Sequence, residues 1–204
     1  MRVLIVAPTV GDLRPLATNT EIDAIAPGHD TDIVSGEVSQ LRLMGRAERQ
    51  HYDVIHFLAH GSEAGIHLSD GVMPPKDMAQ LARHTRAKLI FLNACSSTIP
   101  GQYLVDNGIP AVIVQNRDVD DKDAVRIAAY FYNELTVNNS DLRKAYDVAN
   151  PHDGTLSWLS NGNYRDMLTG EVAGLKKGFV LLTAAVIGHV VLTAGLLIYL
   201  ALLH

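Results

Sequence analysis

Short apolar runs alternate along the chain with segments whose apolar residues recur every three or four positions. Runs rich in Val, Ile and Leu predict buried strands at 2–7, 53–59, 88–94 and 111–114, with shorter ones at 32–34 and 155–159. The intervening segments predict helices at 18–25, 38–50, 75–85, 101–108, 120–135 and 141–150. Strands that alternate with helices indicate an α/β domain, in which helices cover both faces of a mostly parallel sheet. A hairpin is expected around 65–73, with its turn at Asp70-Gly71.

The last 27 residues have a different pattern, because 178–204 contains no Asp, Glu, Lys or Arg. A helix of this length would extend roughly 40 Å, which exceeds the ~30 Å of a bilayer's hydrocarbon core. A helix that is apolar on every side must be buried, and a chain end is a poor place to be surrounded by protein. We therefore expect a transmembrane helix at 178–203; the alternative is a hydrophobic helix that docks into a partner.

This segment sets the expected organisation of the chain. A domain at 1–165 precedes a juxtamembrane linker at 166–177 and the membrane helix. The first apolar run is too short for a signal peptide, so we expect a single-pass C-terminal tail anchor in the cell membrane. Lys176 and Lys177 stand directly before the helix, which predicts that the domain lies in the cytoplasm.

The net charge and the cysteine content of the chain exclude several kinds of function. The net charge of the 204-residue chain is -5 and no basic stripe is present, which argues against nucleic acid as a partner. Cys95 is the only cysteine, so an intramolecular disulfide and a cysteine-rich zinc site are excluded. The histidines show no closely spaced ligand pattern, and we expect neither a metal nor a cofactor.

Two of the predicted strands end close to a reactive side chain. The strand at 53–59 is followed by His60, and the strand at 88–94 is followed by Cys95. Functional groups of open α/β sheets collect beyond the carboxyl ends of the strands, which lie about 5 Å apart for neighbours and about 10 Å apart across one intervening strand. A thiol becomes a nucleophile when it loses its proton, and a nearby imidazole can take that proton.

Gly61 fits the same chemistry. Without a side chain, its backbone N–H can approach a substrate carbonyl and, together with the amide of Cys95, form an oxyanion hole. The residues alone leave a plainer reading open. A single cysteine in an apolar context is often a small buried hydrophobe, and a histidine at a strand end is often a surface group.

The segments "YDVIHFLAHG" and "LIFLNACSS" closely resemble the two catalytic motifs of CHAT-type peptidases, a bacterial branch of the caspase-like cysteine peptidases. The resemblance implies a caspase-like fold, a catalytic dyad of His60 and Cys95, and an oxyanion role for Gly61. It covers residues 50–150 well, and 1–49 and 151–165 loosely. One departure is that "NACSST" lacks the glycine that commonly follows the serines in this family.

Other polar residues are expected to assist the dyad. His56 and Asn93 belong to the same two motifs. They are expected to contact the residues of the dyad without touching the substrate. Asp120 and Asp121 could form an acidic specificity pocket, as in related peptidases that cut after Arg or Lys. Their other interpretation is that acidic residues in a first helical turn complement the helix dipole.

The expected function is that of a membrane-anchored cysteine endopeptidase that cleaves a protein or peptide substrate through a thioester. Habits of the family imply a role in bacterial stress or antiviral defence. His189, near the middle of the membrane helix, and small residues on that helix could form homo-oligomers through the tail; the alternative is a neutral histidine hydrogen-bonded within its own helix. Two alternatives stay open: a non-catalytic caspase-like binding module, and an effector whose clustered tails perturb the membrane.

Overall fold

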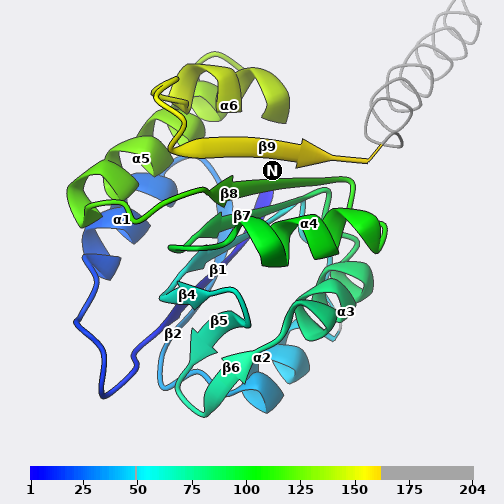
Figure 1. Cartoon of the computed structure of the whole chain (residues 1–204). Helices are drawn as coiled ribbons and strands as arrows, with labels where there is room; N and C mark the ends of the chain where they lie inside the picture. The colour runs from blue at the N-terminus through cyan, green and yellow to red at the C-terminus, as the bar shows by residue number, and fades with distance from the viewer. Residues whose placement is uncertain (49, 162–204) are drawn as a thin grey trace, which may run out of the picture. The chain divides into compact units, whose positions relative to one another are not determined.

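Six strands form the central sheet, in the order β2-β1-β3-β7-β8-β9 (Figure 1). The computed structural model describes residues 1–48 and 50–161. The strands are β1 (Arg2–Pro8), β2 (Asp30–Gly36), β3 (Val54–Leu58), β7 (Leu89–Asn93), β8 (Ala111–Gln115) and β9 (Leu156–Ser160). All neighbouring pairs are parallel except β8 and β9, which are antiparallel. The predicted mostly parallel sheet is therefore confirmed.

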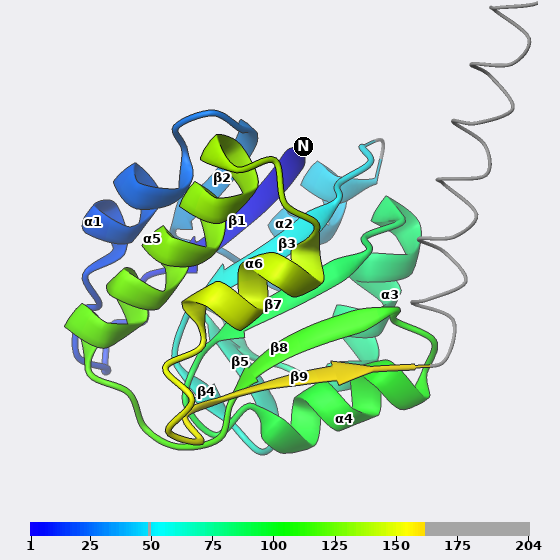
Figure 2. The ribbon, with the colours of Figure 1, turned by 90° about the horizontal axis from the view of Figure 1, so that it is seen from above.

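Helices cover both faces of this sheet, as Figures 1 and 2 show together. One face carries α1 (Thr18–Ile25), α5 (Asp121–Val137) and α6 (Leu142–Ala149). The other carries α2 (Gln40–Ala47), α3 (Pro75–Thr85) and α4 (Thr98–Asp106). Helix α4 begins three residues before the predicted start. Pro100 lies in its first turn, where a missing backbone N–H costs nothing, so this proline does not delay the helix.

The parallel strands are buried on both faces, which explains their continuous apolar runs. On one face, Leu4, Phe57 and Ile90 belong to a core cluster that also contains Leu43 of α2, Met78 of α3 and Leu104 of α4. On the other face the core is aromatic. The ring of Phe91 lies 4.5 Å from His56 and 5.5 Å from Phe131, measured between ring centroids.

A second, three-stranded sheet follows β3 and consists of β4 (Gly61–Ser62), β5 (Gly65–Leu68) and β6 (Gly71–Met73). The predicted hairpin is present, but Leu68 pairs with Gly71, so its turn lies at Ser69 and Asp70, one residue earlier than expected. No local pattern indicates β4, which has only two residues. The backbone N–H of His67 donates to the carbonyl of His60 at 2.9 Å and so holds this sheet against the end of β3.

Residues Met1–Asn161 form one compact unit. None of the helices described within it has the length and apolar character needed to cross a membrane. The predicted linker at 166–177, the predicted transmembrane helix at 178–203 with His189, and the domain boundary at 165 lie outside the described residues.

Candidate active site

His60 and Cys95 come from strands that lie side by side. β3 pairs with β7 in parallel, and Leu58 is the register partner of Asn93. His60 follows the first strand by two residues, and Cys95 follows the second by two residues. Both line one pocket with a volume of about 80 Å³ at the carboxyl ends of these strands. The sheet thus brings together two residues that are 35 positions apart in the sequence.

The imidazole of His60 is held by the loop between β1 and α1. Its Nε2 lies 2.7 Å from the backbone carbonyl oxygen of Arg14. A carbonyl only accepts hydrogen bonds, so Nε2 carries the hydrogen, and in the neutral ring Nδ1 is left as the basic nitrogen. A fixed tautomer of this kind is what a general base requires.

The side chain of Arg14 binds the first turn of α5. Its Nη2 forms an ion pair with Oδ1 of Asp121 at 2.8 Å, and both residues line the pocket. Asp120 lies elsewhere: it caps α5 by accepting from the N–H of Lys122 at 3.0 Å, and it lines a neighbouring pocket of about 180 Å³. The capping contact explains Asp120 without a substrate, whereas Asp121 faces the pocket of His60 and Cys95.

Gly61 packs against the turn that carries Cys95. A Cβ at this position would overlap the backbone carbonyl oxygen of Cys95 and would lie 3.0 Å from the Cβ of Ala94. Only glycine lets the two backbone segments approach this closely. The oxyanion role of the Gly61 and Cys95 amides stays a prediction, but the two residues are in contact.

The thiol of Cys95 is partly exposed at the pocket wall. Burial raises the pKa of this thiol and the carboxylate of Asp118 raises it further, while a hydrogen bond from the backbone N–H of Val119 lowers it. The thiol therefore carries its proton at neutral pH. The next residue, Ser96, has a φ of 53°, a left-handed conformation in which a glycine is usually preferred.

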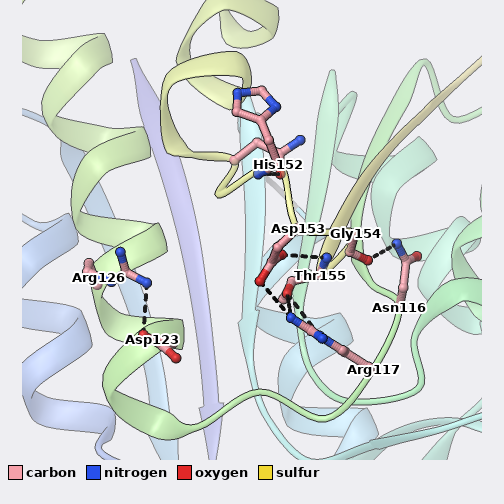
Figure 3. A network of polar contacts seen from close by, with 9 residues as sticks. Asn116, Arg117, Asp123, Arg126, His152, Asp153, Gly154 and Thr155 are labelled. Atoms are coloured by element: carbon pink, nitrogen blue, oxygen red, sulfur yellow. Dashed lines mark hydrogen bonds and ion pairs between the residues drawn. The ribbon is translucent and has the colours of Figure 1, made fainter.

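The loop between β8 and α5 presents Asp118 and Val119 to the thiol, and neighbouring side chains fix this loop (Figure 3). Its first residue, Asn116, donates from Nδ2 to the carbonyl of Gly154 at 2.8 Å. The next, Arg117, forms an ion pair with Asp153 at 2.6 Å. These contacts join residues that are more than 35 positions apart, so no local pattern in the sequence indicates them.

Replacing Asp118 by Asn is expected to increase the rate at which iodoacetamide labels Cys95 at pH 7, by roughly two- to fivefold. The change removes a negative charge that raises the thiol pKa, so more thiolate forms at neutral pH, although a thiolate of lower pKa is a weaker nucleophile. Asp120→Asn is the matched control, because Asn also caps helices and Asp120 is not among the groups that shift the thiol pKa. Equal rates for Asp118→Asn and wild type would contradict this account.

His56 and Asn93 lie behind the pocket or in its wall. His56 is fully buried and contacts Glu21 and Tyr132. Asn93 lines the pocket and is hydrogen-bonded to Glu21 and Gln115. Reasoning from the sequence missed Glu21, although one signal was available: Glu21 lies four residues before Ile25 on α1, and thus on that helix's buried face.

The described residues contain no group of three His, Cys, Asp or Glu side chains that could hold a metal ion. The residues that line the pocket supply a thiol, an imidazole, carboxylates and backbone amides. This is the set that acyl transfer through a cysteine nucleophile uses.

Comparison with known proteins decides the family. The sequence pattern that defines the CHAT domain matches residues 11–149, which is most of the chain. The chain belongs to the CHAT domain family. Within this CHAT domain, the match includes the loop that carries Arg14, the strands that lead to His60 and Cys95, and the helix that begins at Asp121.

A solved structure shares the fold of this CHAT domain. Gingipain R, an Arg-specific cysteine proteinase, superimposes with a TM-score of 0.56 at 13% sequence identity; the match covers 78% of this chain and 46% of that one. A chain of the Saccharomyces cerevisiae separase–securin complex gives a TM-score of 0.47 at 17% identity, covering 78% of this chain and 11% of that one. The CHAT domain thus spans less than half the length of either protein. No curated protein matches the chain. The mixed α/β fold is thus shared with gingipain R.

Proposed function

We propose that this CHAT domain protein is a cysteine endopeptidase in which Cys95 is the nucleophile and His60 transfers the proton. The observation that carries the proposal is that His60 and Cys95 line one pocket, while the Arg14 carbonyl orients the imidazole. The caspase-like fold supports it, because that fold is used by cysteine proteases.

The proposed reaction begins when Nδ1 of His60 removes the proton from the Cys95 thiol. The thiolate attacks the scissile carbonyl carbon, and the negative charge moves to the carbonyl oxygen, where the backbone N–H groups of Gly61 and Cys95 stabilise it. The tetrahedral intermediate collapses to a thioester as His60 gives its proton to the leaving amine. Water, deprotonated by His60, then hydrolyses the thioester and releases the thiol. The Arg14 carbonyl stabilises the imidazolium that forms between these steps.

The charges of the pocket wall support a proposal for the substrate class. Asp121 contributes an accessible carboxylate to this wall, whereas the carboxylate of Glu21 is engaged by His56 and Asn93. Arg14 is the one Lys or Arg side chain among its described lining residues. A basic substrate side chain would replace Arg14 at Asp121, so we propose cleavage beside a positively charged residue. In this proposal Asp121 binds the basic substrate side chain. Asp120 does not, because it lines the neighbouring pocket.

The remainder of the proposal rests on the sequence. Residues 178–203 would anchor the protein in the cell membrane with the CHAT domain in the cytoplasm, and tails that associate through small residues and His189 would form homo-oligomers. Substrates would then be proteins near the membrane, cleaved during bacterial stress or antiviral defence.

The proposal is tested with the full-length chain in detergent, a peptide library and an electrophilic probe for reactive thiols. Wild type should cleave at least one peptide and react with the probe. Cys95→Ala should lose both activities, and Cys95→Ser should lose cleavage because a hydroxyl is far less acidic than a thiol. Cleavage by Cys95→Ala at the wild-type rate would reject the assignment.

One observation favours a second function, that of a non-catalytic binding module. The thiol pKa is raised, and the loop between β8 and α5 holds the thiol. A binding module would leave Cys95 slow to alkylate in the presence of every peptide tested, and Cys95→Ala would bind its partner as wild type does. In a membrane-perturbing effector, by contrast, leakage from lipid vesicles would survive Cys95→Ala and disappear when residues 178–203 are removed.

A further inference from the structure

A chain of buried hydrogen bonds runs beneath the pocket that His60 and Cys95 line. It joins side chains from five elements, in the order Tyr132, His56, Glu21, Asn93 and Gln115. All five side chains are buried, with exposed fractions of 0% for His56 and 6% for Glu21. Polar groups lose their bonds to water at this depth, so each needs a partner within the protein.

Glu21 links the two hydrogen-bonded residues that lie on different strands, His56 on β3 and Asn93 on β7. Its Oε1 lies 3.0 Å from Nε2 of His56 and also accepts a hydrogen bond from Nδ2 of Asn93. An ionised carboxylate only accepts, so Nε2 of His56 carries a hydrogen. One oxygen of a residue on α1 therefore connects β3 to β7.

The two residues that Glu21 connects belong to the strands that precede the proposed dyad. His56 precedes His60 by four residues on β3, and Asn93 precedes Cys95 by two residues at the end of β7. The bond from Glu21 thus bridges these strands next to the positions where the imidazole and the thiol emerge. The bridge adds a side-chain link to two strands whose backbones already pair from Val54 to Leu58.

The turn that carries Cys95 is held from both sides by Gln115. Before the thiol, Oδ1 of Asn93 accepts from Nε2 of Gln115; after it, Oγ of Ser97 accepts from the backbone N–H of Gln115 at 2.9 Å. Between them Ser96 adopts its left-handed conformation, which residues with a Cβ disfavour. The hydrogen bonds keep the turn in a shape that the chain alone would not favour.

From this arrangement we propose that Glu21 is a positioning residue, whose buried carboxylate sets the distance between His60 and Cys95 by joining His56 to Asn93. The inference rests on the proposed function, because it concerns the same pair of residues. It assigns Glu21 no contact with the reacting atoms. Glu21 acts through the two strands and through the turn at 93–97.

The test uses the full-length chain in detergent and two variants, Glu21→Leu and Glu21→Gln. Leu fills the space without an acceptor, and we expect kcat to fall about 10- to 100-fold with KM changed less than about threefold, because the reacting groups are misplaced while substrate binding is kept. Gln retains an oxygen in the same place and should restore most of the activity. Asp23→Asn, the same kind of change at an exposed site on α1, should behave as wild type.

A purely structural role for Glu21 is distinguished by its coupling to His60. In wild type, His60→Ala should slow the alkylation of Cys95 at pH 7. In Glu21→Leu the same replacement should have little further effect, because the imidazole no longer reaches the thiol. Additive effects of the two changes, or a folded Glu21→Leu with the wild-type kcat, would overturn the inference.

The two proposals fail in different ways. If wild type cleaves no peptide, the proposed function fails, while the alkylation experiment with Glu21 and His60 still decides the positioning role. If Glu21→Leu does not fold, Asn93→Ser takes its place. It removes the amide that donates to Glu21, together with the oxygen that accepts from Gln115, and leaves the bond between His56 and Glu21 intact.

Discussion

His60→Ala is expected to lower kcat at pH 7 by roughly 10²- to 10⁴-fold, the range that loss of a general acid–base produces. The reason lies in the state of the thiol. Burial raises the pKa of Cys95 and Asp118 adds to this shift, so little thiolate is present at neutral pH without a base. The oriented imidazole removes that proton in wild type. Without His60, the leaving amine also lacks a proton donor.

The effect of His60→Ala on the rate should depend on pH. In His60→Ala the rate should follow the thiolate fraction and rise with pH until the raised thiol pKa is passed. The loss relative to wild type is therefore largest at neutral pH and smaller in alkaline solution. His84→Ala is the matched control, since His84 is an exposed residue of α3 that does not line the pocket. If His60→Ala lost the same factor at every pH, proton removal from the thiol would not be the step that His60 serves.

The sequence predicted most of the fold because local patterns carry that information. Apolar runs located the parallel strands, and Thr18–Ile25 and Pro75–Thr85 form helices at the predicted positions. The order of strands is a different matter, since it depends on how distant segments pack. No pattern within β3 or β7 states that the two are neighbours, and the pocket of His60 and Cys95 depends on that fact.

Most of the residues that support the site could not be predicted from local sequence patterns. The Arg14 carbonyl orients His60 from 46 residues away, through a backbone atom that every residue type possesses. Gln115 holds the Cys95 turn from the next strand, and nothing in "AVIVQ" marks that role. Glu21 could have been recognised in the sequence, because a carboxylate on the buried face of α1 requires a partner. Polar residues on apolar faces are thus the signal from which buried networks can be predicted.

The left-handed Ser96 gives physical meaning to a departure seen in the sequence. The motif lacks a glycine where the family commonly has one after the serines, and the turn nonetheless contains a positive φ, at the first serine itself. A residue with a Cβ costs about 1–2 kcal/mol in this conformation, and the hydrogen bonds between Ser97 and Gln115 offset part of that cost. The turn is therefore compatible with this sequence only in its present surroundings.

Gly61→Ala is expected to lower the free energy of unfolding by about 1–3 kcal/mol and kcat by about 100-fold. The added methyl group would overlap the carbonyl oxygen of Cys95, a backbone atom that cannot rotate away as a side chain could. Either the end of β3 or the Cys95 turn must move. Both movements separate the imidazole from the thiol and shift the amides proposed to bind the oxyanion.

Gly45→Ala separates this steric effect from any general effect of replacing glycine. Gly45 lies inside α2 with no atom within 4 Å of an added Cβ, and alanine is the better helix former, so stability should increase by about 0.5–1 kcal/mol. Both variants are compared by chemical denaturation and by peptide cleavage in the same detergent. A Gly61→Ala protein with the wild-type kcat would mean that the Cys95 turn moves away without cost to catalysis. The close contact between the two strand ends would then serve packing alone, because a site that depends on it could not tolerate the displacement that the methyl group imposes.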